Sequence, residues 1–201
     1  FTLWTDVFTF VWLLIMMYAT KFLDGLNGLV SGMSVIGATI LFVTSMVLGQ
    51  SLGVFLALII AGAFLGFLPY NFKGKIFLGE SGSTLAGFLL GTLALIGPAK
   101  ISITLLVLGI PLLDVLWVVF ERIFRAKKSP FRGDLRHLHF KLLRGGFSSR
   151  AAVITLWLVA LFFGLAGLQF QGGGHGVLLF GLIIVMILFL YLTRKKKYGN
   201  M

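Results

Sequence analysis

Apart from Asp6, the sequence has five acidic residues, and carboxylates near apolar stretches are uncommon and can take part in chemistry. Four of them fall at or near the ends of different apolar stretches: Asp24 in KFLDGLNGLVSG, Glu80 in KIFLGESGSTLAGFLLG, Glu121, and Asp134 in FRGDLRHLHF. The fifth, Asp114 in GIPLLDVLWVVF, lies inside an apolar stretch. Carboxylate oxygens bind magnesium, and a magnesium ion held in this way commonly bridges to phosphate. If the fold brings these acids to one face, they can form a site for a phosphate-containing ligand.

Asp24 and Glu80 each have a structural interpretation and a functional one. Asp24 lies in Asp-Gly-Leu-Asn-Gly, where the glycines allow a turn and leave backbone open to a ligand, but it could also cap a helix that begins near Leu29 while Lys21 reaches the membrane interface. Glu80 precedes an apolar run, where an acid and hydroxyls could satisfy free N–H groups or where a phosphate could bind. The residues alone leave both alternatives open.

Asp114 lies deep within an apolar run, where a charged side chain costs about 2.5–3.5 kcal/mol on insertion scales. Either a buried structural partner or a role in a site would have to offset this cost. Pro111 stands three residues earlier and can open the helix backbone locally.

His137 and His139 are candidate ligands, but residues at i and i+2 do not share a helix face and no third strong ligand stands nearby. Isolated loop histidines are usually surface residues, and we expect these two to be exposed. Their basic neighbours favour contacts with phosphate over zinc. These neighbours are Arg132, Arg136, Lys141 and Arg144.

Apolar runs separated by polar breaks predict seven membrane-spanning helices of roughly the 20 residues that cross a hydrocarbon core. The expected spans are 7–23, 30–49, 53–70, 83–98, 101–121, 151–170 and 176–193. The basic segment 122–150 is too polar to insert. We therefore expect an all-α, polytopic helix bundle that forms a single membrane domain over residues 1–201, with a cytoplasmic loop at 122–150.

The basic residues divide unequally between the two sides of this bundle. If residues 1–6 lie outside, 16 of the 17 Lys and Arg residues lie on the inner side, and Lys100 alone lies opposite. The positive-inside rule makes that side cytoplasmic, so the expected location is the inner (plasma) membrane. The net charge of +11 then needs no nucleic-acid partner, because basic residues beside a membrane attract lipid head groups and phosphates.

Two further features bound the interpretation. The chain has no cysteine, which excludes disulfides and thiolate metal sites. It begins with Phe1, and no basic stretch with a small-residue cleavage site leads into the first run, so we expect no signal peptide and a start that is not the natural one.

Three segments, in order and with the right approximate spacing, resemble the polyprenyl-phosphate N-acetylhexosamine-1-phosphate transferases. KFLDGLNGLVSG is similar to that family's Asn-x-x-Asp-Gly-x-Asp-Gly-Leu segment, and KIFLGESGSTLAGFLLG to its Phe-x-Gly-Asp-x-Gly-Ser segment. The stretch from GIPLLDVLWVVF to LRHLHF is similar to its Pro-x-x-Asp span and His-rich cytoplasmic loop. The resemblance covers about residues 1–150. It implies that Asp24 keeps the first aspartate of its motif, whereas Lys21 and Asn27 replace an asparagine and the second aspartate.

The same resemblance places Glu80 at the position of the family's magnesium-ligating aspartate. His137 and His139 match two positions of its His-x-His-His pattern, and Phe140 replaces the last histidine. The family also carries an Asp-Asp pair in an earlier loop, and this sequence has none. We therefore interpret the chain as the C-terminal portion of a longer enzyme or as a shortened descendant.

The resemblance implies transfer of N-acetylhexosamine-1-phosphate from a UDP-linked sugar to undecaprenyl or another polyprenyl phosphate, with release of UMP, at the cytoplasmic face. Glu80 would bind Mg²⁺, with Mn²⁺ as an alternative, and Asp24, His137 and His139 would be catalytic. The substrate-binding residues would be Lys21, Asn27, Lys75, Asp134 and Arg136. The partners would be the lipid phosphate, the UDP-sugar and the membrane, with a homodimer left open. A catalytically degenerate membrane subunit is the second hypothesis, and a transporter the third.

Overall fold

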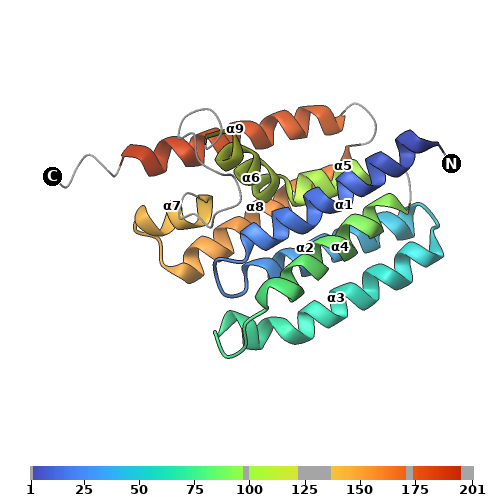
Figure 1. Cartoon of the computed structure of the whole chain (residues 1–201), viewed down its shortest axis with the longest axis horizontal. Coiled ribbons are helices and arrows are strands. Elements are labelled where there is room, and N and C mark those ends of the chain that lie inside the picture. The colour runs from blue at the N-terminus through green and yellow to red at the C-terminus, as the bar shows by residue number, and fades with distance from the viewer. Residues whose placement is uncertain (1, 97–99, 122–136, 171–173, 196–201) are drawn as a thin grey trace.

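The computed structural model describes residues 2–96, 100–121, 137–170 and 174–195. All regular structure in these ranges is helical, which confirms the predicted all-α fold (Figure 1). The helices are α1 (Leu3–Leu23), α2 (Leu29–Val47), α3 (Ser51–Phe72), α4 (Gly79–Leu95), α5 (Lys100–Val107), α6 (Gly109–Glu121), α7 (Leu138–Arg144), α8 (Ser149–Gln169) and α9 (Gly174–Lys195).

The long helices lie side by side as a bundle, with α2 packed against α3 and α1 against α4. Helix α8 packs on α2 and α5, and α9 lies over α6 at the periphery. The turn between α1 and α2, the turn between α3 and α4, and helix α7 all lie at the same end of the bundle, at the left of Figure 1. Alternating helix direction thus gathers segments that are far apart in the sequence.

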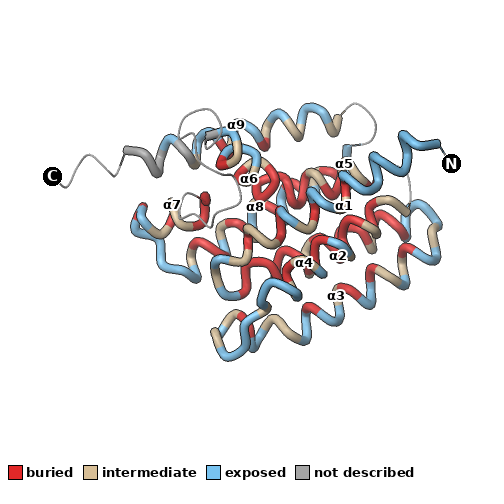
Figure 2. The backbone as a smooth tube through the Cα atoms, viewed as in Figure 1, coloured by how far each residue is buried: buried red, intermediate tan, exposed pale blue. Residues whose placement is uncertain are grey.

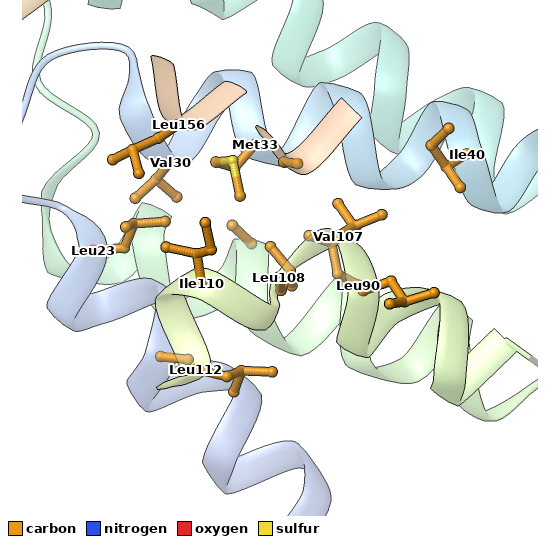
Figure 3. Packing of buried hydrophobic residues seen from close by; sticks show 14 of the residues in the cluster. Leu23, Val30, Met33, Ile40, Leu90, Val107, Leu108, Ile110, Leu112 and Leu156 are labelled. Carbon is orange, nitrogen blue, oxygen red and sulfur yellow. The ribbon is translucent and has the colours of Figure 1, made fainter. Parts of the chain in front are cut away.

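The core lies where α1, α2, α4, α5 and α8 face one another, whereas α3 and α9 contribute fewer buried residues (Figure 2). Leu23, Val30, Ile110 and Leu156 come from four different helices and point toward one another in Figure 3. Large apolar side chains also cover the outer faces of α1 and α3, and Trp4 is 81% exposed. Such a surface needs lipid around it, so this is a membrane protein.

The prediction of seven spans is not confirmed. Four helices are long and apolar enough to cross a membrane: α1, α2, α3 and α8. Helices α5 and α6 together reach that length, but the chain bends by 71° between them. Helix α4 has only 17 residues, and among the described residues α9 contributes the shorter apolar helix Gly174–Phe189. The apolar composition therefore predicted where the helices lie. It did not predict the short length of α4 or the bend between α5 and α6, because an apolar run does not show where a helix ends or bends within it.

The bend between α5 and α6 lies at Leu108, three residues before Pro111. Leu108 and Leu112 still donate backbone bonds to the residues four positions earlier, at 2.9 Å each. Proline has no N–H, so the carbonyl of Val107 loses its usual helical donor at this point. The expectation that Pro111 opens the backbone locally agrees with this break, which turns Asp114 toward the end of the bundle where α7 lies.

Helices α1 and α4 approach each other closely through two glycines of α4. A Cβ built on Gly87 would lie 2.3 Å from the backbone oxygen of Met16, which leaves no room for a side chain. One turn later, the indole Nε1 of Trp12 donates to the carbonyl of Gly91 at 3.0 Å. Small residues that let backbones approach are typical of helix packing in membranes. This contact fixes the end of α1 relative to the start of α4.

Candidate active site

The turns at the left end of the bundle bring together the first two sequence motifs. Lys21 lies in the last turn of α1, and Glu80 lies in the first turn of α4. The Lys21 ammonium donates to Oε1 of Glu80, and the two side chains are 34% and 72% exposed. Two of the positions that depart from the family pattern therefore form an ion pair with each other, 59 residues apart in the sequence.

Glu80 does not cap its helix. The N-cap residue of α4 is Leu78, which makes no side-chain capping bond. The hydroxyls of Ser83 and Thr84 donate backward to the carbonyl of Glu80 rather than accepting from free N–H groups. The capping interpretation of this motif is therefore wrong, and the first amides of α4 keep their capacity to bind an anion.

Asp24 ends α1 instead of starting α2. Its backbone N–H donates to the carbonyl of Lys21 at 3.3 Å, and the N-cap of α2 is Gly28, with a left-handed φ of 85°. The Asp24 carboxylate is half-buried and makes no side-chain hydrogen bond to any residue that the structure describes. Burial raises the pKa of Asp24 to about 6. The ionised carboxylate is thus poorly solvated, and a nearby cation would stabilise it.

Asn71 connects the two turns, and the sequence interpretation did not identify it. Its Oδ1 accepts from the Gly28 N–H at 2.9 Å and from the Ser31 hydroxyl at 2.7 Å. Its Nδ2 donates to the carbonyl of Ile76 at 2.9 Å. One buried amide therefore holds the Asp-Gly turn against the turn that leads to Glu80. An amide at the end of an apolar helix, two residues after Pro69, was the available signal.

The remaining predicted substrate-binding residues make no hydrogen bond to the Lys21–Glu80 pair or to the histidines among the residues that the structure describes. Asn27 is exposed, and its Nδ2 would lie 2.8 Å from a Cβ built on Gly74, so it lies beside the second turn. Lys75 is exposed in that turn. Asp134 and Arg136 lie outside the described residues.

His137 and His139 are buried, which contradicts the expectation of surface histidines. His137 is the N-cap residue of α7, and its Nδ1 lies 2.9 Å from Oδ2 of Asp114. The Leu138 N–H donates to the other carboxylate oxygen, Oδ1, at 2.8 Å. Asp114 is only 4% exposed, so these two contacts are what offsets the cost of its burial. Of the two alternatives for Asp114, the structure shows the buried partner, which is the segment that carries the histidines.

The two histidine rings lie parallel to each other, with centroids 5.8 Å apart. His137 also stacks on Phe22 of α1 at 5.5 Å, which ties α7 to the end of that helix. The i, i+2 spacing does not separate the rings, because His137 has extended backbone as an N-cap while His139 lies inside the helix. The helical periodicity that separates positions i and i+2 applies only when both residues lie inside the helix, and His137 does not.

His139 lies against the Asp-Gly turn. A Cβ built on Gly25 would lie 2.2 Å from its Nε2, so only glycine fits at position 25. This Nε2 is buried and has no hydrogen-bond partner among the residues that the structure describes, and the residue is 1% exposed. Burial lowers the pKa of His139 to about 4, so its ring is neutral at physiological pH. His139 therefore contributes packing and a neutral ring rather than positive charge.

No group of three or more potential metal ligands forms among the residues that the structure describes. The contacts instead link Glu80, Lys21, the Asp24 turn, His139, His137 and Asp114 at one end of the bundle. This arrangement defines a polytopic helical membrane protein with a site of mixed charge beside its inter-helix turns.

Comparison with known proteins shows which proteins this chain resembles. Residues 1–98 match the model of glycosyl transferase family 4. The chain is 32% identical over 190 residues to a probable undecaprenyl-phosphate N-acetylglucosaminyl 1-phosphate transferase of Bacillus subtilis. The aligned residues cover 90% of this chain and 52% of that protein. It is 35% identical over 196 residues to a decaprenyl-phosphate N-acetylglucosaminephosphotransferase of Mycolicibacterium smegmatis, with coverage of 84% and 48%.

A third relative is a phospho-N-acetylmuramoyl-pentapeptide-transferase of Staphylococcus aureus, 36% identical over 166 residues, with coverage of 81% of this chain and 50% of that protein. Residues 1–98 therefore carry the pattern of glycosyl transferase family 4, and the chain is similar over most of its length to these polyprenyl-phosphate sugar-1-phosphate transferases and their relative. The chain spans about half the length of the curated relatives it matches.

Proposed function

We propose that this protein transfers N-acetylhexosamine-1-phosphate from a UDP-linked sugar to a polyprenyl phosphate in the synthesis of cell-wall or surface polysaccharide. A lipid phosphate oxygen attacks the β-phosphorus of the UDP-sugar, the bond from that phosphorus to the bridging oxygen breaks, and UMP leaves with the electron pair. The products are a polyprenyl-diphospho-sugar and UMP. The observation that carries this proposal is the convergence of the Asp24 turn, Glu80 and the Asp114-held histidines at one end of the bundle.

Positioning of the substrates and stabilisation of charge are the main tasks of the protein in phosphoryl transfer, because it takes little part in the covalent chemistry. Lys21 provides positive charge for the diphosphate. The Asp24 turn, with Gly25 and exposed backbone, lies beside it and orients the phosphates. His137 offers a ring nitrogen to a phosphate oxygen, while neutral His139 supports the turn.

The residues present fit a magnesium ion that is shared with substrate, and they do not fit an all-protein metal centre. Magnesium is usually held by one or two carboxylates, and water and phosphate complete its coordination. Glu80 provides one exposed carboxylate, of which Oε1 is engaged by Lys21. A magnesium ion at Glu80 would supply charge neutralisation for the diphosphate.

The orientation of the site can be tested with single introduced cysteines, because the chain has none of its own. Lys75→Cys and Ser51→Cys are matched, since both positions are exposed; Lys75 lies in the turn after α3 and Ser51 is the first residue of α3, at the opposite end of that helix. The charge distribution predicts that a membrane-impermeant thiol reagent labels position 51 in intact cells. Position 75 should react only after the membrane is opened. Labelling of position 75 in intact cells would put the site on the outside and contradict the proposal.

The activity is tested by supplying a radiolabelled UDP-N-acetylhexosamine and a polyprenyl phosphate to the purified protein, expressed from its complete reading frame. We expect equal amounts of lipid-linked sugar and UMP, and loss of both on chelation of divalent cations. UDP-N-acetylglucosamine and UDP-N-acetylmuramoyl-pentapeptide in parallel distinguish the two kinds of relative. Absence of lipid product with every donor would favour the degenerate-subunit alternative.

A further inference from the structure

Asp114 uses both oxygens of its buried carboxylate on consecutive groups of the same segment. Oδ2 contacts Nδ1 of His137 at 2.9 Å, and Oδ1 accepts from the Leu138 N–H at 2.8 Å. The first of these partners is a side chain that can exist as two tautomers, and the second is a backbone donor. Asp114 therefore holds the start of α7 and also constrains the chemistry of one ring.

An ionised carboxylate can only accept hydrogen bonds, so the His137 nitrogen that faces it must carry the proton. The ring is then protonated at Nδ1, and Nε2 is left as the nitrogen that exchanges a proton or a hydrogen bond with another group. Stacking on Phe22 and on His139 further restricts the ring plane. Orientation and tautomer are thus both set within the protein.

We infer that Asp114 is a positioning residue that fixes the tautomer and orientation of His137, so that Nε2 is the nitrogen presented to substrate phosphate. This inference deepens the proposed function and rests on it for the identity of the ligand. When the ring is neutral, Nε2 can accept a proton, and when the ring is protonated, Nε2 donates to a phosphate oxygen. In both states Asp114 directs the exchange away from Nδ1.

The substitution Asp114→Asn separates the two tasks of the carboxylate. The asparagine oxygen can still accept from the Leu138 N–H, which preserves the attachment of α7. Its NH₂ group then faces Nδ1 of His137, which must become the acceptor, and the proton moves to Nε2. The matched variant Asp114→Leu has similar volume but removes both hydrogen bonds, and it should release α7.

The test uses purified protein labelled with ¹⁵N-histidine and read by NMR at a pH at which the ring of His137 is neutral. The variant His137→Gln assigns the signals of this ring, because they are the ones that it removes. We expect His137 to be protonated at Nδ1 in the parent protein and at Nε2 in Asp114→Asn. A parent ring protonated at Nε2, or an unchanged tautomer in Asp114→Asn, would overturn the inference.

Activity provides a second measurement that a purely structural role would not match. Loss of the positioning group should lower kcat by at least about 10- to 100-fold, the range measured for carboxylates that orient metal-binding histidines, with KM changed less. In the His137→Gln background, Asp114→Asn should have no further effect, because its target is absent. An additive loss would assign Asp114 to the fold alone. Failure of the proposed transferase activity would appear in the parent protein, while the tautomer measurement would remain valid.

Discussion

Replacement of Glu80 by glutamine should abolish most transferase activity and leave the fold intact. Glutamine keeps the size of the side chain but removes the charge that binds a divalent cation or balances Lys21. Loss of one preorganised electrostatic contact at a reacting centre typically costs on the order of 10²- to 10³-fold in kcat. The ion pair with Lys21 is largely exposed, so its loss should change the melting temperature little. UMP release and melting temperature in detergent measure the two effects.

Two further variants separate the metal role of Glu80 from the ion pair. Glu80→Asp keeps the charge and introduces the residue that the family pattern has at this position, so it should retain activity if the site adjusts to the shorter side chain. Lys21→Met removes the ammonium that occupies Oε1 and should increase the affinity for Mn²⁺, which electron paramagnetic resonance can follow without substrate. Near-normal UMP release from Glu80→Gln would eliminate Glu80 as a metal ligand and favour the degenerate-subunit hypothesis.

The sequence predicted the side of the bundle on which the acids gather, but not their partners. Counting crossings was enough to put Asp24 and Glu80 at one end, because each apolar run reverses the chain. The ion pair between Lys21 and Glu80 could not be predicted, because it depends on α1 and α4 being neighbours. That pairing follows from the close approach at Gly87, and the 26 glycines in the sequence do not reveal which one makes it.

For Asp114 and the histidines, the sequence indicated the need to offset a buried charge but not the burial of the histidines. The cost of burying a carboxylate is readable in the sequence, and it requires either a buried partner for Asp114 or a role in a site. The structure shows the partner, His137. The sequence interpretation places this residue at the surface, because it has the appearance of an isolated loop histidine. The error arose because burial of a histidine is decided by tertiary contacts, here the stacking on Phe22 and the bond to Asp114, and local composition does not encode them.

Substitution of Gly87 by alanine should separate α1 from α4 and thereby disturb both stability and the site. A Cβ at position 87 would lie 2.3 Å from the Met16 carbonyl oxygen and from the Thr20 hydroxyl, so backbone must move. Gly87 lies two helical turns from Glu80, and Met16 and Thr20 precede Lys21 on α1, so the displacement acts directly on the ion pair. Overpacking of this kind typically costs about 1–3 kcal/mol.

Two other glycines in the chain provide matched controls for this prediction. Gly62 in α3 has no atom within 4 Å of a built Cβ, so Gly62→Ala should gain helix propensity without a clash. At Gly91 a Cβ would lie 3.1 Å from Cγ of Met16, a flexible side chain that can move, so Gly91→Ala should have an intermediate effect. Thermal unfolding in one detergent should therefore rank stability as Gly62→Ala, then Gly91→Ala, then Gly87→Ala. Transferase activity should be lost mainly in Gly87→Ala, because only there must the backbone of α1 move. Equal melting temperatures for Gly87→Ala and Gly62→Ala would mean that α1 and α4 do not approach closely at this position, and the placement of Lys21 beside Glu80 would lose its structural support.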